Sequence, residues 1–376
     1  MTMTMARWCR RNLFAKPFDA ALSIVSIPLC AWILYEVAAW TIAVARWDVI
    51  PDSLKVMMVG IYPAEALWRA WVAVAVLGIL FGATLGTVLP LRARMAATII
   101  VLSALLAVLL ARSDASNAAC VLAIGLSAVA GWAATSQWRR ARQGVLYAWI
   151  AGLVVVFAIL SPPGAESWGG LLLSVLLTIV ASILTIPLGV LLAFGRRNRF
   201  ASVRVCCTAY IEVMRSVPLI LIVYWVWIIA PLLSPEFSIA DVLRGMAGFV
   251  LFFSAYVAEY VRSGLQSVPR GQVEAARSLG LSAFDVNYQI VLPQAIRVVV
   301  PALVGNVLDI FNAAPLVFII GLTDFLRTGQ MVLANPQYSG RTYEIYSFLL
   351  VTYFVIGSLI TFAARRLEGQ LGRGAR

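Results

Sequence analysis

The sequence predicts an all-α, polytopic membrane protein with about ten transmembrane helices. Of its 376 residues, 62% are hydrophobic and only 12% are charged, whereas a soluble domain carries roughly 25% charged residues. The apolar residues also come in runs that match the length needed to cross a bilayer, about 17–25 residues. A water-soluble protein of this size would not contain so large a fraction of apolar residues. Composition and run length alone therefore predict a membrane protein.

Ten apolar runs are bounded by charged or turn-forming residues, and each is predicted to span the membrane as a helix. In chain order they are 20–45, 67–89, 95–111, 117–134, 144–160, 170–194, 218–233, 245–261, 298–322 and 345–364.

The distribution of positive charge predicts the orientation. With both termini in the cytoplasm, 22 of the 29 lysine and arginine residues fall on the cytoplasmic side, including the basic N-terminal tail. The reverse orientation would break the positive-inside rule. Retention of positively charged segments on the cytoplasmic side of the membrane therefore explains the net charge of +12. We expect no nucleic-acid partner.

The absent residue types exclude several chemistries. The chain has no histidine, which removes the usual acid–base and triad enzymes. Neither of its two lysines, Lys16 and Lys55, follows a glycine, so a Walker A nucleotide site is absent. The five cysteines show no metal-ligand spacing. We therefore expect no catalytic residue, metal or cofactor in this chain.

The chain changes character near residue 161, where the segment 161–167 is rich in turn-forming residues. Residues 1–160 are predicted to form an N-terminal transmembrane extension of about five helices, and residues 161–376 a second unit. Within that second unit, a cytoplasmic segment at about 266–297 is too long and too patterned for a passive connector.

This cytoplasmic segment reads as a helix–turn–helix at the membrane face. Residues 272–279 favour a short helix, and Gly280 fits the left-handed position that follows it. Ser282 is placed to cap a second short helix, with Asp285 in its first turn. Pro293 then lets the chain turn back into the membrane.

Small side chains in this segment indicate a contact with another protein. Ala275, Ala276 and Gly280 would give the first helix a narrow surface, which lets a partner's backbone approach closely. Glu274 would add a charge-assisted hydrogen bond to that partner, and it is also spaced to pair with Arg277 on its own helix.

The pattern Glu-Ala-Ala-x-x-x-Gly, then nine residues, then Ile-x-Leu-Pro resembles the EAA loop of ABC-importer permeases. The residues before it resemble the polar amino-acid (histidine/glutamine) permease family, and Arg215-Ser-Val-Pro218-Leu is similar to that family's Arg-Gly-Thr-Pro-Leu signature. The resemblance covers about residues 168–369, and the extra N-terminal spans are most similar to the general L-amino-acid permeases. The residues that it assigns to ATPase coupling are Gly271, Gln272, Glu274, Ala275, Ala276, Leu279, Gly280, Ile290, Leu292 and Pro293.

The resemblance implies a type I ABC-importer permease core in the bacterial inner membrane. On this interpretation the chain is the permease subunit of an importer for polar or general L-amino acids, and it forms the translocation path. The implied partners are a second permease subunit, a cytoplasmic ABC ATPase dimer that carries ATP and Mg, and a periplasmic amino-acid-binding protein. The sequence departs from the family's usual pattern in the penultimate span. There Asn312-Ala313-Ala314-Pro315-Leu316 replaces a motif with charged and hydroxyl side chains.

Polar residues inside a predicted span are costly, so each is a functional candidate. Asn306, Asp309 and Asn312 recur every three residues along one face of the penultimate span. They either line the substrate path, where Asp309 would receive an ammonium group, or form polar helix–helix contacts. Arg215 and Pro218 at the mouth of the seventh span are candidates for the same path, with Arg215 facing a substrate carboxylate.

Two pairs with i, i+3 spacing are also predicted as internal ion pairs. They are Glu212 with Arg215 and Glu259 with Arg262. Pro187 and Gly189 are expected to interrupt the sixth span, either as a broken helix that exposes backbone groups or as a simple kink.

Three other readings compete with the importer subunit. An ion-coupled secondary amino-acid carrier would act without an ATPase and would carry its own coupling-ion site, usually with inverted repeats. A membrane enzyme is disfavoured by the absent histidine and metal ligands. A receptor or scaffold would not need the spacing of the cytoplasmic loop.

Overall fold

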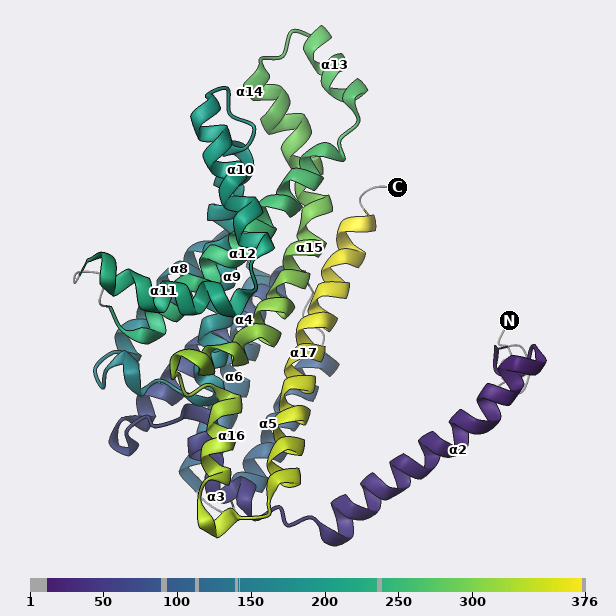
Figure 1. Ribbon diagram of the computed structural model, residues 1–376, viewed down its shortest axis with the longest axis vertical. Helices are drawn as coiled ribbons and strands as arrows, with labels where there is room; N and C mark the ends of the chain where they lie inside the picture. Colours follow the sequence, from purple (N-terminus) through teal and green to yellow (C-terminus); the bar gives the residue numbers. More distant parts are fainter. Residues whose placement is uncertain are drawn as a thin grey trace.

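The computed structural model describes residues 12–88, 93–111, 115–138, 141, 143–234 and 239–373. These residues form helices and connecting turns, and no β-strand occurs among them; the nearest to one is an isolated bridge between Gly170 and Asp324. The helices run mostly along the long axis of the molecule (Figure 1), and α13 lies at one extreme of that axis, which we call the α13 end.

The first helix, α2 (Pro17–Ala39), continues as the π-helix η1 (Trp40–Val44) and stands apart from the other helices in Figure 1. None of its residues is buried. Its contact with the rest of the chain is at its far end, where the Trp40 ring meets the rings of Trp47 and Tyr343 edge-on.

Short helices gather at the end of the molecule opposite α13. They are α3 (Val49–Val59), α16 (Phe325–Leu333) and the 3₁₀ turn η7 (Pro336–Tyr338). With the start of α17 (Thr342–Arg373) they bury one apolar cluster, which includes Val49, Met57, Phe325 and Ile345.

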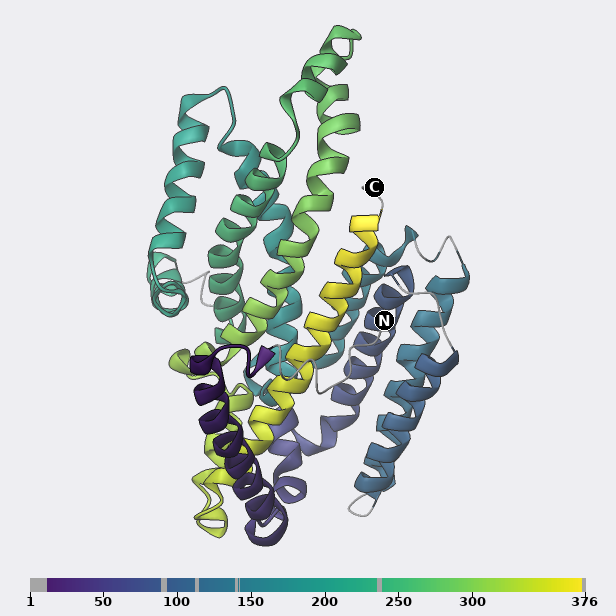
Figure 2. The same ribbon diagram turned by 90° about the vertical axis from the view of Figure 1, so that its right-hand side faces the viewer.

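The rest of the N-terminal part is a group of helices beside the main bundle (Figure 2). Its members are α4 (Leu67–Val88), α5 (Ala93–Ala111), α6 (Ala115–Gln137) and α8 (Val145–Leu160). Glycines let α4 and α6 touch closely, because a Cβ on Gly82 would lie 1.9 Å from the Ala128 carbonyl oxygen. Such small-residue packing is typical of helix pairs in membranes.

The main bundle is built on α9 (Gly170–Gly195), α12 (Asp241–Gln266) and α15 (Leu292–Ala313). The 3₁₀ helix η6 (Ala314–Ile320) follows α15. Leu173 of α9, Phe249 of α12 and Ile310 of α15 belong to the main apolar core, which also takes in Ala73 of α4 and Val156 of α8. Residues from both sides of position 161 therefore share one core, and the predicted boundary there stays a prediction.

The segment before the seventh predicted span differs from expectation. The sequence analysis predicted no helix between the runs 170–194 and 218–233, but α10 (Ala201–Ser216) forms there. Pro218 then opens α11 (Leu219–Leu233), as predicted. The two helices meet at a bend of 114°, so α10 rises toward the α13 end while α11 runs across the bundle (Figure 1).

Of the two alternatives for the sixth span, the broken helix was wrong, because α9 runs continuously through Pro187; the simple kink stays a prediction. Gly189 has a packing role instead. A Cβ there would lie 2.5 Å from Val257 Cγ1 and 2.9 Å from the Ser254 carbonyl oxygen, so the glycine lets α9 and α12 pack closely.

Seven described helical stretches are long and apolar enough to cross a membrane, and eight if the bent α10–α11 pair is one span. The predicted ten is thus approximate. A helix forms at each of the ten places, but α8 has 16 residues and the apolar stretch of α5 covers only Ala96–Leu105. The basic tail 1–11 and the end of the second span at 89 lie outside the described residues.

Candidate functional site

The predicted helix–turn–helix forms the tip of the α13 end (Figures 1 and 2). Pro269 precedes α13 (Arg270–Ser278), and the turn after it bends at Gly280, whose φ is +82°. The Leu281 amide donates to the Ala276 carbonyl at 3.3 Å and the Gly280 amide to Arg277 at 2.9 Å. The predicted left-handed glycine is therefore confirmed.

Ser282 caps the second short helix, α14 (Ala283–Asp285), as predicted. Its hydroxyl oxygen accepts from the Asp285 amide at 3.1 Å, and the hydroxyl lies 2.5 Å from the Asp285 carboxylate. The chain continues through the π-helix η5 (Val286–Val291) into α15. Pro293 was predicted to let the chain turn back into the membrane; it lies at the start of α15, directly after η5 and within the continuous helical run Ala283–Ile320.

A small apolar core holds the two helices of the tip together. It contains Val268, Ala276, Val286 and Val291. Ala276 was expected to face a partner, but its own loop buries it to 5% exposure, so its small size lets α13 approach η5. A hydrogen bond of 2.6 Å from the Gln294 amide to the Gln272 side-chain oxygen also ties α13 to α15.

The remaining coupling candidates divide between the surface and the interior of the tip. Ile290 and Leu292 are half-buried in the structure of the loop itself. The Glu274 carboxylate accepts no hydrogen bond and joins no ion pair in the part of the chain that the structure describes, so the pair with Arg277 does not form there. The outward-facing candidates are Gly271, Gln272, Glu274, Ala275, Leu279, Gly280 and Pro293.

An ion-pair cluster centred on Glu259 joins α9, α10 and α12 below the tip. Glu259 pairs with Arg262, as predicted, and also lies 3.4 Å from Arg196 and 3.6 Å from Arg215. The predicted pair between Glu212 and Arg215 was wrong, because Glu212 pairs with Arg196 at 3.1 Å. The sequence analysis missed Arg196 because its partners lie 16 and 63 residues away along the chain.

Arg215 also lies beside two tyrosines of α12 that the sequence analysis did not single out. Its guanidinium carbon is 5.8 Å from the centre of the Tyr256 ring. Tyr260 lies close enough to Arg215, Tyr256 and Asp309 to interact electrostatically with all three. Tyr260 is thus near both of the predicted path residues Arg215 and Asp309. The only signal in the sequence was the i, i+4 spacing of the two tyrosines.

The three polar residues of the penultimate span do not share one environment. Asp309 and Asn312 are exposed on the surface of this chain, as are Arg215 and Pro218. Asn306 is 3% exposed, and its side-chain oxygen has no hydrogen-bond partner among the described residues. Asn306 therefore lies inside the helix bundle and away from the surface on which Asp309 lies.

Asp324, which the sequence analysis also missed, begins α16 at the opposite end of the molecule. Its carboxylate accepts from the amides of Leu326 at 2.9 Å and Arg327 at 3.1 Å. The residue is fully buried, and this burial raises the pKa of Asp324 from 3.8 to about 6.

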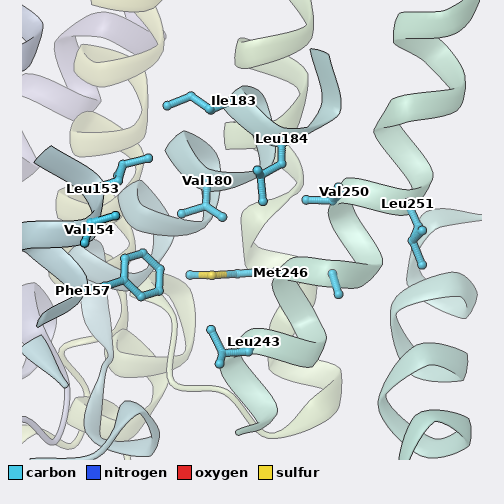
Figure 3. Close-up of a pocket in the computed structure, with 11 residues that line it drawn as sticks. Leu153, Val154, Phe157, Val180, Ile183, Leu184, Leu243, Met246, Val250 and Leu251 are labelled. Carbon is cyan, nitrogen blue, oxygen red and sulfur yellow. The ribbon is translucent and has the colours of Figure 1, made fainter. Parts of the chain in front are cut away.

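A pocket of about 630 Å³ lies between α8, α9 and α12. Figure 3 shows its lining of aliphatic side chains with Phe157 and Met246. No lining residue is polar, so this pocket does not suit an amino acid. Among the described residues, no group of three or more cysteine, aspartate or glutamate side chains is placed to hold a metal ion.

A family model and several known proteins are similar to this chain. The family model described as binding-protein-dependent transport system inner membrane component matches residues 185–372. The inner membrane amino-acid ABC transporter permease protein YhdY of Escherichia coli is 29% identical, over 98% of this chain and 93% of its own length. The glutamate/glutamine/aspartate/asparagine transport system permease protein BztC of Rhodobacter capsulatus is 27% identical, over 98% and 94%.

A shorter relative aligns with about half of the chain. The glutamate/aspartate import permease protein GltK of Escherichia coli is 34% identical, over 52% of this chain and 91% of its own length. A chain in the crystal structure of an amino acid ABC transporter with histidines is 28% identical, with a TM-score of 0.50. The match covers 54% of our chain and 92% of the chain in the crystal structure.

Proposed function

The chain belongs to the family of binding-protein-dependent transport system inner membrane components, and from this premise we propose that it is the membrane-spanning permease of an ATP-driven amino-acid importer. YhdY, BztC and GltK are named as permeases for amino acids, and this supports an amino-acid substrate here, with polar amino acids as the expected class. They also favour this function over a secondary carrier that acts without an ATPase.

The observation that carries the proposal is the tip at the α13 end. It is a rigid helix–turn–helix with its own apolar core, and it extends beyond the other helices (Figure 1). Glu274 is exposed there without a partner among the described residues. A charged, preorganised surface of this kind is suited to transmit the motion of an attached subunit.

The proposed partner at this tip is a cytoplasmic ABC ATPase dimer, which would bind ATP and Mg. This chain would then be a non-enzymatic subunit without a cofactor of its own. A periplasmic amino-acid-binding protein would deliver substrate at the opposite end of the molecule.

A second permease subunit is the remaining partner that we propose. Asp309, Asn312 and Arg215 lie on or beside predicted membrane spans and are exposed on the surface of this chain. Polar groups at membrane depth face protein or a water-filled cavity, because exposure to lipid is costly. A second permease that covers this face would enclose a polar path between the two subunits.

We propose that this path recognises the zwitterionic part of an amino acid. Arg215, beside the Tyr256 ring, would attract the carboxylate, and Asp309 the ammonium group, with Tyr260 near both. Pro218 would fix the bend beside Arg215. Asn306, whose buried side-chain oxygen has no partner among the described residues, would face the interior of the bundle and not the path.

The proposed location is the bacterial inner membrane, with both termini and the α13 tip in the cytoplasm. The bias of positive charges supports this orientation. In Figure 1, α17 ends in the half of the molecule that holds α13, which supports a C-terminus on that side. A cysteine placed at Ala275 should react with a membrane-impermeant maleimide only in inside-out vesicles; labelling of intact cells would contradict the orientation.

The central test is to purify the chain from its native membrane in mild detergent and to identify its partners. A co-purifying ATPase and second permease are expected, and the reconstituted complex should take up amino acids only when ATP is supplied to the α13 side. Uptake driven by an ion gradient through the chain without an ATPase would refute the proposal and support the secondary carrier.

A further inference from the structure

Two exposed aromatic side chains on the tip do not belong to the coupling motif. Phe284 is 74% exposed and Tyr288 is 62% exposed. Their rings stack face to face, with centroids 5.8 Å apart and planes that differ by 6°. The two residues are four positions apart on one helical run, so both rings project from the same face. We call them the aromatic pair.

The aromatic pair lies beyond the depth that lipid tails fill. The helical run Ala283–Ile320 has 38 residues, which corresponds to about 57 Å of helix, whereas the hydrocarbon core is about 30 Å thick. Phe284 is the second residue of this run, and the run begins at the tip of the molecule (Figure 1). Exposure there is exposure to water, and clustered apolar side chains in water mark contact surfaces.

The rest of the tip holds the aromatic pair in place. Val286 and Val291, between and beyond the pair on the same run, are buried in the small apolar core. The Asn287 amide group donates to the Ala283 carbonyl at 2.8 Å, and the Gln289 amide group to Asp285 at 3.1 Å. With the inner face fixed, the pair is presented on a rigid support and loses little freedom when a partner binds.

The aromatic pair also continues the proposed coupling surface. Leu279, at the end of α13, is 82% exposed and is joined to the pair by only four residues, one of which is Gly280. Leu279 and the pair are therefore apolar side chains exposed on the same helix–turn–helix that exposes Glu274. Interfaces commonly combine a few buried aromatic anchors with polar groups at the rim.

We propose that Phe284 and Tyr288 form an aromatic anchor that inserts into an apolar cleft of the ATPase subunit. This inference rests on the proposed function and extends it, because the anchor adds apolar contact area next to the contact that Glu274 makes. The pair is the main apolar determinant of affinity, while α13 transmits the motion.

The test measures binding of the purified ATPase to the detergent-purified permease complex. Phe284→Ala and Tyr288→Ala should each weaken binding by about tenfold or more, as truncation of an anchor residue does. Tyr288→Phe should retain most of the affinity, because it keeps the ring. Phe200→Ala is the matched control, since Phe200 is an exposed ring (56%) at the start of α10, on the same side but off the tip.

The outcomes separate the two levels of the proposal. If the unaltered complex binds no ATPase, the proposed function fails. If it binds ATPase and both alanine variants bind equally well, the function stands and the anchor is refuted. All variants should elute as the unaltered complex does on size exclusion, because the two rings take no part in the core of the tip.

A membrane surface is the competing occupant, because aromatic rings also gather at lipid headgroups. A fluorophore on a cysteine that replaces the exposed neighbour Ala283, which leaves both rings in place, distinguishes the two in liposomes. Protection from an aqueous quencher on addition of ATPase is expected. Quenching by brominated lipid that ATPase does not change would overturn the proposal.

Discussion

Gly280→Ala should weaken attachment of the ATPase while leaving insertion into the membrane intact. Gly280 has a φ of +82°, and an alanine in this left-handed region costs about 1 kcal/mol. No neighbouring atom lies within 4 Å of the place that a Cβ would occupy. The cost is therefore backbone strain alone, and it acts at the single turn between the two helices of the tip.

The strain is relieved only if the turn changes. Rotation at Gly280 would break the hydrogen bonds from Gly280 to Arg277 and from Leu281 to Ala276, and would move α13 away from Val286. A penalty of about 1 kcal/mol lowers the ratio of native to altered loop about fivefold. Affinity for a partner that requires the native loop should fall by up to about the same factor.

The assay is ATPase binding to purified complex, together with thermal unfolding in the same detergent. Gly321→Ala is the matched control, because Gly321 also has a φ of +82° and open space at its Cβ position, but it follows η6, outside the tip. Both variants should lose similar thermal stability, and only Gly280→Ala should lose ATPase affinity. Equal affinity in the two variants would refute the role assigned to the turn.

Three further changes test other parts of the structure. Burial raises the pKa of Asp324 to about 6, so the folded state keeps a proton that the unfolded chain releases. The free energy of unfolding should therefore fall by about 3 kcal/mol as pH rises from about 4 to above 6. Asp324→Asn should abolish this pH dependence, and a Tm–pH curve of the variant that runs parallel to that of the unaltered protein would contradict it. Asp309→Asn should raise the KM for zwitterionic substrates about tenfold without changing ATPase binding, as a lost charge contact of about 1.4 kcal/mol would; an unchanged KM would show that Asp309 has no substrate role. Glu259→Gln should lower stability by about 2 kcal/mol, because Arg196, Arg215 and Arg262 lose their shared anion; an unchanged Tm would mean that solvent screens the cluster.

The ion-pair cluster has a structural consequence for coupling. Glu259 links α9, α10 and α12 just below the tip, and Gly264 brings α12 and α15 together one turn further on, where a Cβ would lie 2.2 Å from Val299. Both ends of the loop therefore start from helices that are held together. A force applied to α13 would reach the bundle through these contacts.

Much of the protein followed from local sequence. Apolar runs predicted where helices form, because a membrane span needs only a continuous apolar segment that satisfies its own backbone hydrogen bonds. The turn at Gly280 and the cap at Ser282 were also predicted correctly, because both depend on the conformational preference of one residue and on partners within a few positions. The spacing from Glu274 to Pro293 likewise led to the proposed coupling segment, whose role stays a prediction.

Other features depended on the packing of distant segments. The partner of Glu212 is Arg196 rather than Arg215, because α10 packs against α9, at whose end Arg196 lies. Ala276 faces its own loop, and Gly189 serves a helix contact rather than a break, since a small residue does not specify which surface will approach it. Tyr256 and Tyr260 could be linked to the predicted path only because Tyr256 lies beside Arg215 and Tyr260 lies near both Arg215 and Asp309. The sequence alone thus determined the helices, the loop and the family, through interactions over a few residues. The tertiary structure decided which side chains share a surface, because that depends on how helices far apart in the chain cross.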